Sequence, residues 1–545
     1  MDYERLAELL FPHIQQEPTF YETRFPARSL PAGAKVTRIG PSPTGFVHLG
    51  NLYNAIIGER LAHQSGGVFF LRIEDTDDKR EVPGAVETIL SAMDGFGVRF
   101  DEGATPEGET GQYGPYRQRQ RKEIYQTVAK KLVRMGYAYP CFCTEEQLNA
   151  MREQQIAEKL NFGYYGPWAV CRDLDYETVA ARIQAGDPYV LRFRSQGDPE
   201  RFLPVQDAIR GELSVQENYQ DFILLKSDGI PTYHFAHVVD DHFMRTTHVV
   251  RGEEWLATLP MHIQLFDTLG WARPMYCHTA QLMKMDGDIK RKLSKRKDPE
   301  LALEYYQAEG YLPEAVWEYL LTVLNSNYEQ WRIDNPDTPY TDFPFTTEKM
   351  STSGALFDLE KLENISKDVI CAMPAESIYQ GLLAWSDRYD QDFATLLRQD
   401  PTYALAVLRI GKGGDRPRKD LVNWKQAVDF LSFYYDQRFR IQDPFPTQGP
   451  ARKEILRRYL ELVDFQDDND AWFAKVKQIC EEQNYALQPK KFKKNPELYQ
   501  GSIVEVSNTI RVAMTGRQNS PDLWQISLTL GEDRSRRRLL AAMEG

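Results

Sequence analysis

In one segment of the 545-residue chain, a turn rich in Gly and Pro leads directly into a helical stretch, with a histidine at the junction. The segment reads Pro41-Ser42-Pro43-Thr44-Gly45-Phe46-Val47-His48-Leu49-Gly50. Such a turn exposes backbone N–H groups at the positive end of the helix, which suits a phosphate. His48 is placed to donate a hydrogen bond to a phosphate oxygen as negative charge builds there. Taken alone, a Gly-His pair of this kind is more typical of a plain strand-to-helix turn with a surface histidine.

A second segment, residues 290–297, is basic at six of its eight positions and follows a turn at Gly287. We expect a mobile loop that closes over a polyphosphate, because lysines position phosphates and neutralise their charge without acid/base chemistry. The alternative for an isolated basic run is a solvated surface.

A third segment, Leu71-Arg72-Ile73-Glu74-Asp75-Thr76-Asp77, reads as a strand that ends in clustered carboxylates. In an open α/β sheet, ligands bind at the carboxyl ends of the strands, so Glu74 is placed to meet a substrate ammonium group. Capping or turn roles for Asp75 and Asp77 are the alternative.

The elements around these segments predict a parallel sheet. An extended stretch at 34–39, a helical stretch at 50–64 and an apolar run at 68–73 follow one another as a βαβ unit. Helices are expected at 117–136 and 176–185, strand-like runs at 189–194 and 221–225, and mixed strand and helix character at 231–236 and 247–251. Helical periodicity dominates from about residue 300. Residues 1–34 predict a short amphipathic helix followed by a Pro-containing tether.

Composition excludes several classes of protein. Hydrophobic residues make up 42% and charged residues 27%, which is ordinary for a folded protein and too apolar for disorder. The sequence contains no run of about 18 apolar residues, so we expect no membrane helix, and no signal peptide is visible. We therefore expect a cytoplasmic protein. Six irregularly spaced cysteines do not predict a disulfide scaffold.

The net charge of −13 hides a regional difference. Residues 401–545 hold 24 basic and 19 acidic residues, a net of +5, whereas residues 1–400 carry −18. A basic surface with an interleaved aromatic suits a nucleic-acid backbone, although each cluster alone could be a solvated helix face. The residues proposed for this surface are Arg418, Lys419, Lys490, Lys491, Lys493 and Lys494.

The order of the motifs resembles that of bacterial-type glutamyl-tRNA synthetases, a class I family. The matching segments run from the first signature at Pro41–Gly50 through Leu71–Asp77, Asp228–Tyr233, Val238–His242 and Val250–Glu254 to Lys292-Leu293-Ser294-Lys295-Arg296. The resemblance extends from about residue 35 to the C-terminus. It implies a class I Rossmann-type catalytic domain (35–115 and 230–298), an inserted acceptor-stem-binding domain (116–229), a helical stem-contact domain (299–376) and a helical anticodon-binding domain (377–545), after an N-terminal extension (1–34).

The resemblance also implies a reaction. The family joins L-glutamate to ATP as glutamyl-adenylate, with Mg²⁺, and then transfers the glutamyl group to the terminal adenosine of tRNA(Glu); use of tRNA(Gln) stays open. The positions that match the glutamate site are Arg38, Ser42, Glu74, Tyr233, Arg251 and Trp255. Those that match the ATP site are Thr44, Gly45, His48, Gly50 and Lys295, and the two signatures contribute His48, Gly50, Lys292, Ser294 and Lys295 to catalysis. A monomer is the expectation.

The chain departs from the family pattern in places. Asn51 stands where the generic class I signature has a second histidine, and His237 stands where relatives carry asparagine. Some relatives bind zinc in the inserted domain. Here Cys141, Cys143 and Cys171 offer three ligands, and Tyr164, Tyr165 or Asp173 could be a fourth. We expect a reduced, metal-free trio.

Two alternatives remain. Glutaminyl-tRNA synthetases typically show Pro-Glu-Pro and a complete His-x-Gly-His, with a β-barrel anticodon region, unlike this chain. A catalytically inactive tRNA-binding descendant should have lost pocket arginines or signature lysines, yet Arg38, Glu74, Arg251 and Lys295 are present. An active glutamyl enzyme is therefore the prediction.

Overall fold

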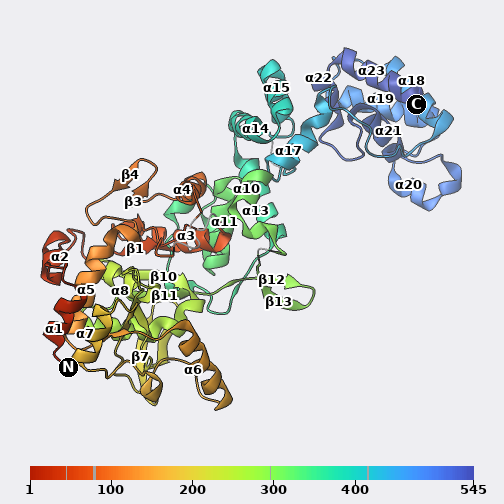
Figure 1. Cartoon of the computed structure of the whole chain (residues 1–545). Coiled ribbons are helices and arrows are strands. Elements are labelled where there is room, and N and C mark those ends of the chain that lie inside the picture. Colours follow the sequence, from red (N-terminus) through yellow and green to blue (C-terminus); the bar gives the residue numbers. More distant parts are fainter. Residues whose placement is uncertain (44–45, 78–81, 295, 414–416, 545) are drawn as a thin grey trace. The chain divides into compact units, whose positions relative to one another are not determined.

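The structure is a computed structural model that describes residues 1–43, 46–77, 82–294, 296–413 and 417–544. The chain divides into two compact units (Figure 1). The first unit comprises Met1–Tyr305 and Trp317–Asp358, and the second comprises Tyr306–Val316 and Leu359–Gly545. No helix among the described residues is long and apolar enough to cross a membrane.

The first unit is built on parallel strands, as the βαβ pattern predicts. Strand β1 (Val36–Ile39) pairs with β2 (Val68–Leu71), and β2 pairs with β3 (Glu102–Thr105), all in parallel. Strand β10 (His248–Gly252) is parallel to β11 (Met275–Thr279). The backbone N–H of Thr247 donates to Val36 O at 2.9 Å, which joins the two sets of strands beside β1.

The chain runs outward from β1 through β2 to β3 and later returns to β10 and β11 on the other side of β1. A reversal of strand order of this kind is a topological switch point, where ligands of open α/β sheets bind beyond the carboxyl ends of the strands. The switch point lies between β1 and β10, so their ends, at Ile39 and Gly252, mark the expected site.

The N-terminal residues contradict the predicted tether. The helix α1 (Tyr3–Leu10) is followed by a second helix, α2 (Pro18–Arg24), and Phe25 after it is buried in the same apolar cluster as Leu6. Arg134 on α5 (Lys122–Arg134) forms ion pairs with three acidic residues of this region. Apolar burial and these ion pairs make the N-terminal segment an integral part of the first unit.

The basic segment also differs from its prediction. Residues Ile289–Lys292 form strand β13, which pairs antiparallel with β12 (Leu282–Asp286) across a turn where Gly287 has φ +61°. Arg291 is held by Asp298, with N–O distances of 2.6 and 2.9 Å. The first part of the segment is therefore a hairpin strand and not a mobile loop, because the antiparallel ladder and this ion pair fix it.

The remaining elements of the first unit fit the mixed character of its sequence. They are α3 (Leu49–Gln64), α4 (Ala85–Gly95), β4 (Gly108–Thr110), β5 (Ala138–Cys141), α6 (Glu145–Ala157), α7 (Tyr176–Gln184), β6 (Val190–Phe193), β7 (Phe202–Asp207), β8 (Gly211–Gln216), β9 (Ile223–Leu225), α8 (Tyr233–Phe243), α9 (Leu259–Leu269), α12 (Tyr328–Asp334) and β14 (Ala355–Leu356).

The second unit is helical in its described part, as expected, and Trp424, Tyr459 and Ile510 contribute to its apolar core. Along the chain, α10 (Leu303–Glu309) and α11 (Pro313–Leu324) contain the boundaries between the units. The other helices are α13 (Leu359–Ala372), α14 (Ala375–Tyr389), α15 (Gln391–Gln399), α16 (Pro401–Arg409), α17 (Trp424–Leu431), α18 (Gly449–Leu462), α19 (Asn469–Glu482), α20 (Pro489–Lys494), α21 (Ile503–Thr515), α22 (Leu523–Leu530) and α23 (Glu532–Glu544).

Candidate active site

The switch point opens into a cavity of about 400 Å³ at the carboxyl ends of β1 and β10. It brings together residues that are more than 200 positions apart in the sequence. The lining includes His48 and all six residues predicted for the amino-acid site: Arg38, Ser42, Glu74, Tyr233, Arg251 and Trp255.

Arg38, on β1, is held by a carboxylate. Its Nε and Nη2 lie 3.2 and 3.3 Å from the two oxygens of Asp241 on α8, and both side chains are buried. Burial opposes the charge of Arg38, but Asp241 and Glu74 together outweigh this effect and raise the pKa of Arg38. The guanidinium is therefore fixed in place and largely neutralised before any ligand arrives.

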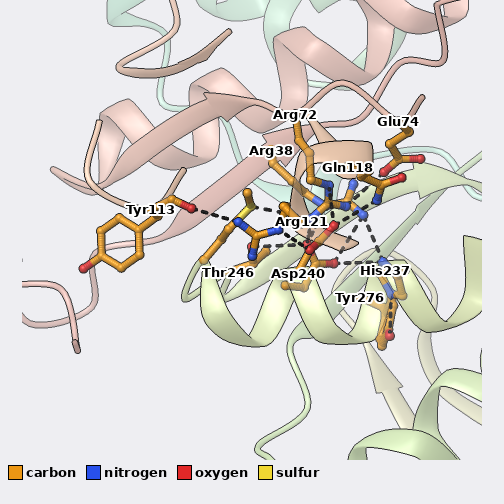
Figure 2. A network of polar contacts seen from close by, with 12 residues as sticks. Arg38, Arg72, Glu74, Tyr113, Gln118, Arg121, His237, Asp240, Thr246 and Tyr276 are labelled. Carbon is orange, nitrogen blue, oxygen red and sulfur yellow. Dashed lines mark hydrogen bonds and ion pairs between the residues drawn. The ribbon is translucent and has the colours of Figure 1, made fainter. Parts of the chain in front are cut away.

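Glu74 is positioned by a neighbour two residues earlier. Arg72, which is fully buried, donates from Nη2 to Glu74 Oε1 at 2.9 Å and from Nη1 to Asp241 Oδ1 at 2.7 Å (Figure 2). Burial raises the pKa of Glu74, while Arg72 and Arg38 act to lower it. A Cβ at Gly40 would lie 2.2 Å from Glu74 Oε1, so a larger residue at position 40 would displace the carboxylate from this position.

A second buried carboxylate, Asp240, ties the start of α5 to this network. It accepts from Arg121 Nε at 2.6 Å, from Gln118 Nε2 at 2.9 Å and from the phenol of Tyr125 at 2.8 Å. Figure 2 shows Gln118 and Arg121 beside Asp240, so this stretch supports the network that holds the cavity residues.

Tyr233, His237 and Asp241 lie on one face of α8 because they are spaced four residues apart, and Tyr233 lines the cavity. His237 Nδ1 lies 2.9 Å from Asp241 Oδ2, and Nε2 lies 3.1 Å from the phenol oxygen of Tyr276. A neutral imidazole satisfies both as the Nδ1–H tautomer. Burial lowers the pKa of His237 to about 3, so this imidazole is neutral at physiological pH.

Arg251, at the end of β10, is also buried but has different partners. Its Nε lies 3.0 Å from His278 Nε2, and its Nη1 lies 3.1 Å from His262 Nδ1. Within the described residues its Nη2 has no hydrogen-bond partner. Because a buried guanidinium without an anion is costly, this side chain is suited to a carboxylate brought by a ligand.

A neighbouring cavity of about 170 Å³ contains part of the predicted nucleotide site. His48, Gly50 and Lys292 line it, and His48 lines the larger cavity as well. Ser294 lines neither cavity, and its backbone N–H donates to Asp298 at 2.8 Å. Three further predicted residues lie outside the described part of the chain: Thr44, Gly45 and Lys295.

His48 begins helix α3 through a capping box. Its Nδ1 accepts from the backbone N–H of Asn51 at 3.2 Å, and Asn51 Oδ1 accepts from the backbone N–H of His48 at 3.0 Å. This geometry places the imidazole proton on Nε2, the atom that can serve as a donor. A Cβ at Gly50 would lie 3.0 Å from His48 Nδ1, so glycine leaves room for the ring. The departure at Asn51 thus has a structural role.

The three cysteines meet in the inserted region, where a tyrosine joins them. Cys143 Sγ lies 3.7 Å from Cys171 Sγ, and the ligand atoms of Cys141, Cys143 and Cys171 lie within 4.8 Å of one another. The phenol oxygen of Tyr164 is 3.4 Å from two of the sulfurs. Sulfurs of a tetrahedral zinc site are about 3.8 Å apart for Zn–S bonds near 2.3 Å, so this set of four donors fits zinc.

The predicted RNA-binding residues separate into two groups. Lys490, Lys491, Lys493 and Lys494 are exposed on α20. The side chain of Arg418 is only 9% exposed and lies over the ring of Phe430, and burial lowers the pKa of Arg418. Lys419 Nζ lies 2.6 Å from Asp368. Only the lysines of α20 therefore offer an exposed cluster, whereas Arg418 is packed within the second unit.

Several residues that position the site were not identified from the sequence: Gly40, Arg72, Asp241, His262 and His278. Asp241 follows Tyr233 at helical spacing, which would have placed both on one face once residues 233–243 were recognised as a helix. His262 and His278 carry no local signal, because only the packing of α9 and β11 brings them to Arg251.

A parallel α/β sheet with two adjoining cavities at its switch point is the architecture of a Rossmann-type ligand-binding protein. Residues 35–364 match the family described as tRNA synthetases class I (E and Q), catalytic domain, and residues 499–543 match the anticodon binding domain family. The chain belongs to these class I tRNA synthetases.

Known relatives agree over almost the whole length. The chain is 57% identical over 542 residues to the glutamate–tRNA ligase of Acetivibrio thermocellus, covering 99% of both chains. It is 48% identical to that of Clostridium perfringens strain 13, covering 99% of this chain and 100% of the relative. A glutamate tRNA ligase from Elizabethkingia meningosepticum, solved in complex with its amino acid, matches with a TM-score of 0.74 at 27% identity, covering 94% of this chain and 99% of that one.

Proposed function

We propose that the protein is a glutamate–tRNA ligase that activates L-glutamate with ATP and transfers the glutamyl group to the 3′-terminal adenosine of tRNA(Glu). The near full-length identity to glutamate–tRNA ligases supports this function. The observation that carries it is Arg251: a buried cation at the cavity wall with a guanidinium nitrogen unpartnered in the described residues.

The charges of the cavity complement glutamate. The substrate has two carboxylates and one ammonium group, and the cavity offers the guanidinium groups of Arg38 and Arg251 and the carboxylate of Glu74. A glutamine side chain is neutral and would leave a buried cation without an anion. The arrangement therefore favours glutamate over glutamine.

The reaction needs positioning more than acid/base catalysis. The glutamate carboxylate attacks the α-phosphorus of ATP, pyrophosphate leaves, and a ribose hydroxyl of the terminal adenosine then displaces AMP from the adenylate. His48, at the start of α3 and between the two cavities, is placed to stabilise phosphate charge. Mg²⁺ bound to ATP supplies further neutralisation of the polyphosphate.

The direct test is aminoacylation with ATP and tRNA(Glu), comparing glutamate with glutamine. Attachment of glutamate is expected, and attachment of glutamine instead would overturn the substrate assignment. A parallel assay with tRNA(Gln) decides whether that tRNA is also glutamylated.

Lys295 tests the second signature. We expect Lys295→Ala to abolish glutamate-dependent ATP–pyrophosphate exchange, measured with tRNA present, and to leave the Kd for tRNA within about twofold, because its contact forms in the transition state. Loss of tRNA binding with exchange intact would contradict this role.

We also propose a structural zinc ion in the inserted region, and the observation that supports it is the position of Tyr164. It supplies a fourth donor beside the three cysteines, and closed structural zinc sites use four. The test is the zinc content of the purified protein.

A further inference from the structure

The two buried arginines of the cavity are held by opposite kinds of partner. Arg38 is paired with the carboxylate of Asp241, whereas Arg251, 4% exposed, is held by two imidazoles. Among the acidic side chains that the structure describes, none forms an ion pair with Arg251. The charge of Arg38 is thus largely compensated inside the protein, and that of Arg251 is not.

The first imidazole, His278, is fixed in one tautomer. Its Nδ1 lies 2.7 Å from Asp207 Oδ2, so Nδ1 carries the proton and Nε2 accepts from Arg251 Nε–H at 3.0 Å. Asp207 is itself held, because its Oδ1 accepts the backbone N–H groups of Ile209 and Arg210 at 2.9 Å each. Burial lowers the pKa of His278, which keeps the ring neutral and able to accept.

The second imidazole, His262 on α9, completes the arrangement. Its Nδ1 accepts from Arg251 Nη1 at 3.1 Å, which places its proton on Nε2, 3.1 Å from Nδ1 of His234. Burial lowers the pKa of His262 well below its ordinary value and that of His234 to about 4. In this series of hydrogen bonds, every N–H donor meets an acceptor only if each imidazole ring is neutral.

This arrangement orients the guanidinium of Arg251 but does not compensate its positive charge, because both partners are neutral. Nε is bound to His278, so the edge formed by Nη1 and Nη2 is the one that remains for a ligand. Nη2 makes no hydrogen bond among the described residues, and the guanidinium lies over the ring of Tyr276, 4.6 Å from its centroid. A carboxylate can bind such an edge with two parallel hydrogen bonds. A carboxamide can accept only through its single oxygen and brings no compensating charge.

We propose that His278, oriented by Asp207, and His262 are positioning residues that hold Arg251 as an uncompensated cation and thereby make the cavity select a side-chain carboxylate over an amide. The proposal rests on the proposed glutamate specificity and adds the residues that enforce it. An acidic residue at either histidine position would hold Arg251 equally well but would compete with the substrate for its charge.

The decisive test compares two substitutions at one position. His278→Gln retains a neutral acceptor for Arg251, whereas His278→Glu supplies an acceptor with a negative charge. We expect His278→Glu to raise the KM for glutamate at least about thirtyfold, since a desolvated charge pair is lost to the substrate, and to leave the KM for ATP within about twofold. His278→Gln should stay within about fivefold of the native KM for glutamate, because the hydrogen bond survives.

The second measurement is the discrimination between glutamate and glutamine. The ratio of the inhibition constant of glutamine to the KM for glutamate should fall at least about tenfold in His278→Glu and change little in His278→Gln. His248 provides the matched control, since it lies on the same strand as Arg251 and bonds to Thr247. His248→Glu and His248→Gln should both leave the ratio within about twofold of the native value.

Asp207→Asn tests the proton arrangement and serves if His278→Glu does not fold. Asparagine can keep the oxygen that caps Ile209 and Arg210 but presents an N–H₂ group to His278 Nδ1. The ring must then carry its proton on Nε2, facing Arg251, so the KM for glutamate should rise at least about tenfold while the KM for ATP does not.

The outcomes separate the two proposals. If the native protein does not attach glutamate to tRNA, the proposed function fails whatever the variants do. If it does, and the folded His278→Glu and Asp207→Asn variants keep the glutamate KM and the glutamine discrimination of the native protein, the positioning role is overturned. Equal losses in His278→Gln and His278→Glu would also overturn it, because charge would then be irrelevant.

Discussion

The cations of the cavity and those of helix α20 are arranged in opposite ways. Arg38 and Arg251 are 5% and 4% exposed and are fixed by side chains from other elements of the first unit. Lys490, Lys491, Lys493 and Lys494 are exposed on one short helix of the second unit. A buried cation recognises one group in one geometry, whereas exposed lysines attract a polyanion through their number.

The difference explains why the net charge says little about the partners. Residues 1–400 carry −18, yet they contain the two guanidinium groups that suit a substrate dianion. The net of +5 in residues 401–545 is small, yet it includes a concentrated exposed cluster. Recognition follows local charge and its burial, and the total does not report either.

The largest effect should come from removing the uncompensated cation. We expect Arg251→Gln to lower kcat/KM for glutamate by about 10²–10⁴-fold, because breaking a buried charge pair costs about 3–5 kcal/mol. The measurement is ATP–pyrophosphate exchange with tRNA present. The Kd for tRNA should not change, and a parallel loss of tRNA affinity would show that the cavity and the RNA surface are not independent.

The next largest effect is expected from acidification, which should lower the free energy of unfolding of the first unit more than that of the second. All nine histidines lie between residues 13 and 278, in the first unit. The folded-state pKa values of His234 and His237 are lowered by burial to about 4 and about 3. Such groups are neutral when folded but protonate near pH 6.5 when unfolded, so their contribution is complete above pH 6.5 and declines as the pH falls toward 4.

The expected loss is about 3 kcal/mol of unfolding free energy for His234 alone between pH 6.5 and 4. His63 has a raised pKa of about 9, so its contribution is constant over this range and does not offset the loss. Hydrogen exchange at several pH values, corrected for intrinsic rates, reports on each unit separately. Equal destabilisation of the second unit would contradict the assignment to histidines.

A smaller effect is expected from the exposed lysines. Changing Lys490, Lys491, Lys493 and Lys494 together to Gln should raise the KM for tRNA about tenfold and reduce the slope of log K against log[salt], because fewer counterions are released. The KM for glutamate should be unaffected. Arg457 and Arg458 give a matched control, since both are paired with glutamates: Arg457→Gln with Arg458→Gln should leave the KM for tRNA within about twofold.

The smallest effect on catalysis should come from changes to the cysteine cluster, because none of its three cysteines lines either cavity. We expect about one zinc per chain by metal analysis, a lower content in Tyr164→Phe, and loss in Cys143→Ser. Glutamate activation should change less than threefold, because a structural ion acts through stability. Purified native protein without zinc would support the metal-free trio predicted from the sequence.

The sequence determined the class of fold and the function because both are encoded locally. The βαβ pattern of residues 34–73 predicted β1, α3 and β2 closely, since apolar periodicity and glycine breaks act over a few residues. The resemblance carried by the motifs also placed Arg38, Glu74, Tyr233 and Arg251 in one site, and the structure brings them to one cavity. The roles assigned to these residues stay predictions.

Local reasoning failed where packing decides. The predicted N-terminal helix is present, but the tether expected after it contains a second packed helix, and the basic segment begins as a hairpin strand, because burial and strand pairing override local composition. Arg418 and Lys490 look alike in the sequence, but only the fold buries the first and exposes the second.

The βαβ pattern thus predicted an α/β fold, and the resemblance carried by the motifs predicted a glutamate site, since residue types fix which charges are available. Only the tertiary structure decided how those charges are compensated. Asp241 reaches Arg38, and Asp207, His278 and His262 reach Arg251, through elements that are distant along the chain. The physical reason is that electrostatic compensation depends on distance and burial, and the fold sets both.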